Sequence, residues 1–458
     1  MPKTVTAALF ASALLTLNVQ ASDLLQVYKE ALSNDAYYGS AHAALAASRE
    51  KLPQGRAGLL PSIDVAASSS RTNSNFAPDG ALNLNQTYHN ENYRLSFTQP
   101  LFNWANWEQF ELSKLIVSAN EALFAQTQQD LIVRVAQAYF DMLAAHDMLD
   151  SNQAQKKAIT EQLASAKRNF DVGTQTITGT HEAQARYDLI VAQEFSARND
   201  LETKRSALQQ IIGRFPDPLA VLKAGVKLNS PSPATIEPWM ESAEKKNYGV
   251  INSQFSLEIA KRNISKNRGG HLPTINLFAN ANRGNTNGSS QFGNSSRSNA
   301  QVVGVELNMP LFSGFAMSSK VREAIALENK SRNDLEAAKR SAKQIARVSY
   351  FGINFGLAQV KALEAAEVSS QAALDLNLLE YQVGGRINID ILNAQQQLYS
   401  SRMQLAKARY DTIMNGLKLK SAAGNLSEED LTAVNALLDS TTTTSPTPVA
   451  SAQDVMAD

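Results

Sequence analysis

The chain carries one structural unit twice, and this internal repeat constrains its fold more than any other feature. Residues 168–200 align with residues 379–411 without a gap, at an offset of 211 positions. The matching pairs include Phe170 with Tyr381, Val172 with Val383, Gly173 with Gly384, Ala183 with Ala394 and Gln184 with Gln395. Residues 49–63 align with 261–275 at an offset of 212. Each half is therefore expected to build the same succession of elements.

Very long helices are predicted in both halves. Proline is absent from residues 101–215 and again from 311–445, and a helix interior excludes proline because it lacks a donor N–H and clashes with the preceding turn. Both stretches are rich in good helix formers such as Ala, Gln, Leu, Lys and Glu. We therefore predict long helical hairpins over 104–213 and 316–424. A helix over 104–170 would be about 100 Å long at 1.5 Å per residue.

The pattern within these stretches indicates a coiled coil with small side chains at its seam. Apolar or small residues recur at alternating steps of three and four: Leu131, Val135, Ala138, Met142, Ala145 and Leu149 in one stretch, and Ile391, Ala394, Leu398, Ser401, Leu405 and Ala408 in the other. Each hairpin is expected to turn at a glycine, at Gly173 in the first and at Gly384 and Gly385 in the second. Glycine suits a helix end because it tolerates the left-handed conformation.

A different sequence pattern precedes each long helix. Apolar and polar residues alternate over 61–76, 91–102, 273–284 and 300–312. Period two predicts strands with one apolar face. We therefore predict two β-hairpins, 61–102 and 273–312, whose long exposed loops are the polar segments 77–90 and 285–298.

Four strands cannot close a membrane barrel, and their open edges would pair with another chain. Membrane barrels begin at eight strands, so a dimer or a trimer would satisfy the argument. Four aromatic residues stand just past the strand ends, where an interfacial girdle would lie: Trp104, Trp107, Phe312 and Phe315. Packing at the start of the long helices is the alternative role for each of them.

The ends of the chain suggest export. Lys3 precedes an apolar run over 5–17 and a small-residue site at 19–21, the layout of a secretory signal peptide over residues 1–21; an ordinary first helix is the alternative. After it, no run of 18 apolar residues occurs, so no transmembrane helix is expected. A chain of this kind would cross a membrane as a closed barrel.

These observations divide the chain into two repeats and their connections. The first repeat is predicted over 22–213 and the second over 241–438. Between them, the linker 214–240 carries five prolines and is expected to be a loose connector with a short helix or two. The tail 439–458 is low in complexity and is expected to be disordered.

Composition argues against an enzyme and against nucleic-acid binding. Basic and acidic residues are balanced at 43 each, cysteine is absent, and the five histidines are scattered outside any metal-binding motif. No phosphate-binding loop or nucleophile elbow occurs in the sequence. We therefore expect neither a catalytic site nor a metal or cofactor.

Several segments together resemble the TolC family of outer membrane channels. They are the PSI and PTI strand starts (61–63 and 273–275), the MPLFSGF junction (309–315), the VGGR turn (383–386) and the closing ARYD to AAGNL segment (408–426). The resemblance covers essentially the whole chain after the signal peptide, and the duplicated order of the segments makes it specific.

The resemblance implies a homotrimer in the outer membrane of a Gram-negative bacterium. Each chain would give four strands to a twelve-stranded β-barrel, which a long α-helical coiled-coil barrel continues into the periplasm. Such a channel is a passive exit duct for proteins, in type I secretion, or for small toxic molecules. Its implied partners are a periplasmic adaptor, an inner-membrane ABC exporter or proton-driven transporter, and outer-membrane lipid.

The resemblance also implies a gate where the helical hairpins turn. Carried over position by position, the latch falls on Tyr381 and Arg386, with Thr178 and Gly179 on the first-repeat hairpin, and the entrance ring falls on Asp390 and Asn393. Gly179 and Asn393 stand where the family has aspartates. Loss of an acidic ring weakens cation attraction, and Glu182, one helical turn beyond Gly179, is our candidate to replace the missing partner of Arg386. Helix capping is the alternative role for Asp390 and Asn388.

Two other classes of protein remain open from the sequence. A secreted, flagellin-like coiled-coil structural protein would share the Ala- and Gln-rich helices, but it has no need of lipid-facing strands. A periplasmic adaptor also has a helical hairpin, framed by compact β domains for which this duplicated chain has no room.

Overall fold

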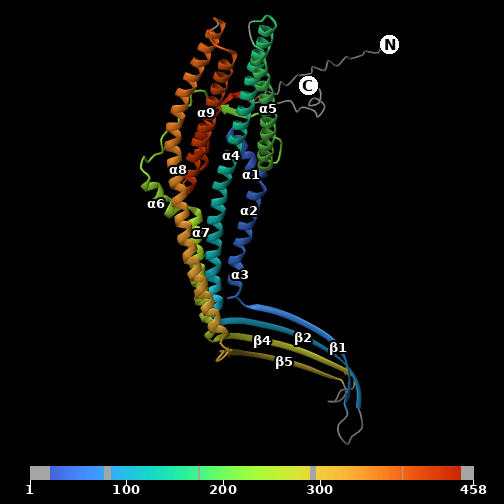
Figure 1. Ribbon diagram of the computed structural model, residues 1–458. Coiled ribbons are helices and arrows are strands. Elements are labelled where there is room, and N and C mark those ends of the chain that lie inside the picture. The colour runs from blue at the N-terminus through green and yellow to red at the C-terminus, as the bar shows by residue number, and fades with distance from the viewer. Residues whose placement is uncertain (1–20, 77–83, 174–175, 289–294, 384, 445–458) are drawn as a thin grey trace, which may run out of the picture.

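A bundle of long helices runs along one axis, and a sheet extends away from one end of it (Figure 1). The computed structural model describes residues 21–76, 84–173, 176–288, 295–383 and 385–444. The predicted signal peptide, apart from its last residue, lies outside the described residues. Among the helices described, none is both long and apolar enough to cross a bilayer.

The two repeats give matching successions of elements. The first comprises α1 (Leu24–Asn34), α2 (Ala36–Arg49), α3 (Lys51–Ala57), β1 (Ser62–Phe76), β2 (Leu84–Phe102), α4 (Trp104–Asp171) and α5 (Ile177–Ile212). The strand β3 (Ala220–Leu222) lies between the repeats. The second comprises α6 (Glu237–Lys246), α7 (Tyr248–Arg268), a 3-10 turn (Gly269–His271), β4 (Thr274–Gly288), β5 (Ser296–Asn308), α8 (Ala316–Gln382), α9 (Asn388–Ala422), α10 (Glu428–Asn435) and β6 (Leu438–Thr443).

The long helices confirm the prediction from proline spacing. The helix α4 spans 68 residues and α8 spans 67, and α5 and α9 return alongside them. Within the two predicted seams, every residue is buried except Ala394, which is half-buried. Side chains as small as alanine let the helix axes approach closely, which a seam of large residues would prevent.

The four long strands form one antiparallel sheet in the order β1-β2-β4-β5. The sheet is more extensive than predicted, because β2 begins at Leu84, β4 continues to Gly288 and β5 begins at Ser296. The ranges predicted as loops, 77–90 and 285–298, therefore include residues that belong to strands. Polar tracts extend the ladder because their side chains bond across it: Thr87 donates to Asn73 and Thr286 donates to Asn90. A search for alternating apolar residues does not reveal strands that pair through polar side chains.

A small second sheet corrects two expectations about the connecting segments. The strand β3 lies in the predicted linker, and it pairs with β6, which begins where the disordered tail was expected. The linker also ends early, since α6 begins at Glu237. Threonine is β-branched and favours strands, and the backbone amide of Thr444 donates to the carbonyl of Leu219. The tail prediction is wrong for 439–444, and residues 445–458 lie outside the described residues.

The main core lies where the connecting segments wrap the middle of the helices. Tyr139, Phe140 and Tyr410 are buried there together with residues of α1, α5, β3 and α10. Asp35 illustrates how α2 is attached to α4. Its carboxylate accepts the amide of Tyr38, which caps α2, and receives both terminal nitrogens of Arg134 at 3.0 Å.

Candidate functional site at the helical tips

The two hairpin turns lie at the same end of the molecule, opposite the sheet (Figure 1). The first turn follows α4, where Gly173 adopts a left-handed φ of 76° as predicted. In the second turn, Gly384 lies outside the described residues. Gly385 is not among the residues with positive φ, and its amide donates to the carbonyl of Glu380 at 2.9 Å. Gly385 therefore lies in the turn as predicted, without the left-handed conformation that Gly173 adopts.

Tyr381 joins the tips of the two hairpins. Its hydroxyl accepts a hydrogen bond from Nδ2 of Asn169 at 3.0 Å. Tyr381 stands near the end of α8 and Asn169 near the end of α4, so this contact crosses from one hairpin to the other. Asn169 carries no charge and does not belong to any motif, so sequence reasoning missed it.

Arg386 is held by acidic residues of its own hairpin. Its Nε lies 2.8 Å from Oε2 of Glu380, and its Nη1 lies 3.9 Å from Oδ2 of Asp390. The hydrogen bond and charge of Glu380, followed by the charge of Asp390, raise the pKa of Arg386 above its ordinary value. Glu182 is exposed, and within the described part of the chain its carboxylate forms no ion pair. Thr178 and Gly179 lie in the first turn of α5.

Helix capping does not explain the polar residues at the start of α9. The N-cap position is Ile387, whose apolar side chain forms no capping bond. Asn388 is 2 % exposed, and neither polar atom of its amide finds a partner among the described residues. The carboxylate of Asp390 points to Arg386 instead of bonding backbone amides. The capping alternative is therefore wrong for both residues.

Asn393 faces the first-repeat hairpin. Its Oδ1 accepts a hydrogen bond from Nη2 of Arg186 at 3.0 Å, and the same guanidinium donates from Nη1 to Gln396 at 2.6 Å. Arg186 stands on α5, so it links the two hairpins. Sequence reasoning missed Arg186, although the repeat places it opposite Gln397 and so marks it as a position where the halves differ in charge.

The four aromatic residues near the sheet divide into two kinds. Trp104 donates from Nε1 to the hydroxyl of Ser265 at 3.3 Å and packs over Gly269, so it serves helix-start packing. Trp107 is 48 % exposed, and Phe312 and Phe315, 76 % and 73 % exposed, pack edge-to-face with ring centroids 5.5 Å apart.

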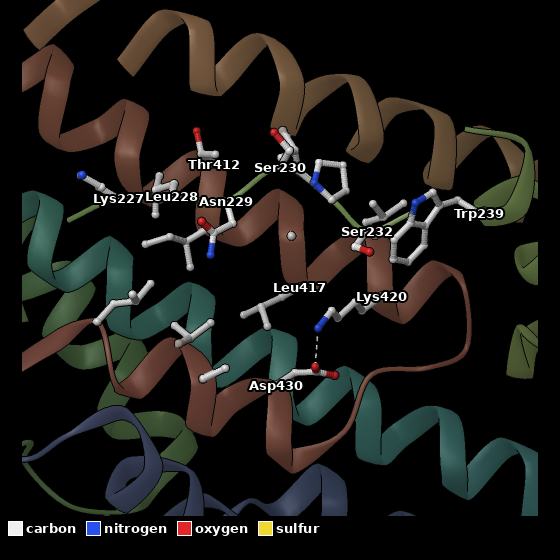
Figure 2. A pocket seen from close by; sticks show the side chains of 18 residues that line it. Lys227, Leu228, Asn229, Ser230, Ser232, Trp239, Thr412, Leu417, Lys420 and Asp430 are labelled. Atoms are coloured by element: carbon white, nitrogen blue, oxygen red, sulfur yellow. Dashed lines mark hydrogen bonds and ion pairs between the residues drawn. The ribbon is translucent and has the colours of Figure 1, made fainter. Parts of the chain in front are cut away.

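A cavity of about 390 Å³ lies away from the tips, between the linker, α9 and α10 (Figure 2). Its lining is largely apolar and includes Trp239 and Leu417. Lys420 and Asp430 form an ion pair inside it, and Lys227 also lines it. No group of three or more His, Cys, Asp or Glu side chains that could hold a metal occurs in the described ranges.

This architecture defines a channel subunit: a sheet with two open edges at one end of a long helical body, and paired helix turns at the other. The chain matches the family described as outer membrane efflux protein over residues 27–214 and 239–425, and it belongs to that family. It is an outer membrane export channel of a Gram-negative bacterium.

Individual relatives agree with this assignment. The chain is 34 % identical to the outer membrane protein TolC of Escherichia coli over 441 residues, covering 94 % of this chain and 88 % of TolC. It is 30 % identical over 419 residues to the alkaline protease secretion protein AprF of Pseudomonas aeruginosa, covering 90 % and 86 %. Its fold matches the Campylobacter jejuni CmeC outer membrane channel with a TM-score of 0.77 and 15 % identity, over 96 % and 98 % of the two chains. The structural-protein and adaptor alternatives are therefore not favoured.

Proposed function

We propose that three copies of this chain form a passive exit duct. Its twelve-stranded β-barrel would span the outer membrane, and its α-helical barrel would reach through the periplasm. The duct would receive cargo from an inner-membrane ABC exporter or proton-driven transporter, joined to it by a periplasmic adaptor. The secretion and efflux proteins among its relatives support cargo of both kinds, secreted proteins and small toxic molecules.

The observation that carries this proposal is an unbroken apolar row across the sheet. Pairing aligns Ile63 with Phe97, Phe97 with Ala279, and Ala279 with Val303. Further along the same face of the two edge strands, Val65 is 79 % exposed and Val305 is 62 % exposed. One apolar face fits contact with lipid, and the unpaired outer edges of β1 and β5 fit pairing with neighbouring copies.

An apolar face on α8 supports assembly of the helical part. Val348, Phe351 and Phe355 follow one another at spacings of three and four residues, which places them on one side of the helix. They are 58 %, 43 % and 71 % exposed. A neighbouring copy would remove this row from water.

The tips would form the periplasmic gate of the assembled duct. We propose that Asp390, with Asn393 beside it, rings the entrance, and that Tyr381 and Arg386 belong to the latch together with the Thr178–Gly179 turn. Glu182 remains our candidate partner for Arg386 across the assembly. The exposed aromatic residues Trp107, Phe312 and Phe315 would lie at the membrane interface.

Single-channel conductance in a planar bilayer tests this function. We expect the detergent-purified protein to give discrete, cation-preferring steps, because three carboxylates at a constriction attract cations. The Asp390→Ala variant should lose that preference. Absence of any conductance would refute the channel, whereas unchanged selectivity in the variant would remove Asp390 from the entrance. The Glu182→Gln variant tests the proposed partner of Arg386, and unchanged closure would exclude it.

A further inference from the structure

Arg186 makes a two-pronged contact between hairpins that are far apart in sequence. Its Nη1 donates to Oε1 of Gln396 at 2.6 Å and its Nη2 donates to Oδ1 of Asn393 at 3.0 Å. The two acceptors are three residues apart on α9, so they lie on one face of that helix. The planar guanidinium presents its donors as a rigid fork that suits two such acceptors.

An apolar contact between the same hairpins accompanies this fork. Leu392, which precedes Asn393 on α9, is 3 % exposed. It is packed in a cluster whose other buried members come from α4 and α5: Ile159, Leu163, Ala166, Ala183 and Ile190. The start of α9 is thus inserted against the α4–α5 hairpin, and Arg186 bonds the residue next to the inserted side chain, Asn393, and the residue one helical turn beyond it, Gln396.

A second arginine has similar geometry and a different placement. Arg402 on α9 donates from Nε to Glu367 and from Nη2 to Gln371, both at 3.0 Å. Both acceptors lie on α8, so this fork stays within one hairpin. Comparison of Arg186 with Arg402 therefore separates a contact between hairpins from a contact inside one.

We propose that Arg186 is a latch of the channel entrance, which holds the start of α9 against α5 and is released when the two hairpins part. The proposal rests on the channel function proposed above. The fork is exposed and its acceptors are neutral amides, so the latch is weak enough to open reversibly. The same guanidinium bonds the side chain of Asn393 and so directs that side chain toward α5.

The test compares Arg186→Gln with Arg402→Gln in the full-length, detergent-purified protein. We expect Arg186→Gln to raise the open fraction of single channels by about two- to fivefold, the range that weak, exposed contacts of a charged side chain provide, and Arg402→Gln to leave it nearly unchanged. An equal effect of both variants, or none from Arg186→Gln, would overturn the latch.

Hydrogen–deuterium exchange of the same samples distinguishes a failure of the latch proposal from a failure of the proposed channel function. Arg186→Gln should accelerate exchange over 388–398 relative to wild type and to Arg402→Gln, whether or not the protein conducts. Faster exchange without any conductance would keep the latch and reject the channel, whereas unchanged exchange would reject the latch.

The Asn393→Asp variant tests the same contact by strengthening it. A carboxylate opposite the guanidinium forms a charge-assisted bond that is stronger than one to an amide. We expect a lower open fraction than in wild type, and no such decrease when Arg186 is Gln. A decrease that persists in the double variant would assign the effect to another partner and overturn the latch.

Discussion

At the scale of single residues, two left-handed glycines end the return helices of the repeats. Gly213 follows α5 with φ 76° and Gly424 lies beyond α9 with φ 72°, at positions that the repeat aligns. Left-handed backbone is unfavourable for residues with a Cβ atom. Gly424 is also crowded, because a Cβ atom there would overlap the carbonyl of Lys246.

We therefore expect Gly424→Ala to lower the melting temperature measured in detergent, by an amount equivalent to about 2 kcal/mol or more. Gly416 is the matched control. It lies inside α9, and a Cβ atom there would meet nothing within 4 Å. Since alanine is the better helix former by about 1 kcal/mol, Gly416→Ala should leave stability unchanged or raise it. Equal melting temperatures for the two variants would refute the steric argument.

Asp147 carries a pH-dependent contribution to stability. Burial, with a smaller effect from Asp150, raises the pKa of its carboxyl above the ordinary value, although the hydrogen bond from Tyr410 at 2.7 Å and the charge of His146 oppose that rise. A raised folded-state pKa favours folding at low pH, and this contribution is lost as pH rises through the folded-state pKa. At neutral pH the ionised group therefore costs stability.

Replacement of Asp147 by Asn tests this sign. The amide oxygen can still accept from Tyr410, so the variant should melt roughly 1–3 °C above wild type at pH 7, and the difference should vanish near pH 4 as the carboxyl becomes protonated. Tyr410→Phe removes the donor and should lower the melting temperature at pH 7. A variant Asp147→Asn that is less stable than wild type at pH 7 would contradict the argument.

At the scale of elements, proline spacing and periodicity predicted the helices closely, since both report on continuous local structure. Contacts between distant segments left no such pattern. Arg186 and its acceptors are separated by 207 and 210 positions, and nothing local marks them as partners. The strands β3 and β6 were missed for the same reason, because each is short and acquires its pairing only in the folded chain.

Tyr139 attaches this small sheet to α4. The residue is fully buried, and its hydroxyl donates to the carbonyl of Ala220 at 2.7 Å, with that of Ser22 at 3.2 Å. Tyr139→Phe would leave the buried carbonyl oxygen of Ala220 without this donor, which would lower the free energy of unfolding by about 1–3 kcal/mol. We expect a lower melting temperature and faster hydrogen exchange in β3 and β6.

Tyr28→Phe is the control for that loss. Tyr28 belongs to the same core cluster and is 6 % exposed, but its hydroxyl forms no hydrogen bond within the described residues. Replacement of Tyr28 should therefore lower the melting temperature less than replacement of Tyr139. If both variants lose equal stability, the cost comes from general core packing and the attachment by Tyr139 is not specific.

At the scale of the whole molecule, the sequence alone left a dimer and a trimer open, because two or three sets of four strands can both close a barrel. The number of copies depends on strand tilt and on contacts between chains, which no pattern within one chain encodes. The unpaired outer edges of β1 and β5 and the apolar face of α8 indicate where those contacts would lie. Assembly is therefore the property that most needs a direct measurement.

Phe355→Arg tests assembly at the α8 face. The ring is 71 % exposed in the single chain and stacks on Phe351 with centroids 5.9 Å apart, so the chain's own fold should tolerate the change. If a neighbouring copy covers this face, a buried unpaired guanidinium would weaken each interface by about 2 kcal/mol or more. We expect light scattering of the detergent-purified proteins to report trimers for wild type, as proposed above, and monomers for the variant. Phe215→Arg, at a side chain 65 % exposed on the linker, should remain trimeric, as should Phe355→Leu. A trimeric Phe355→Arg would show that α8 turns this face to water, and the copies would then have to associate through the strand edges alone.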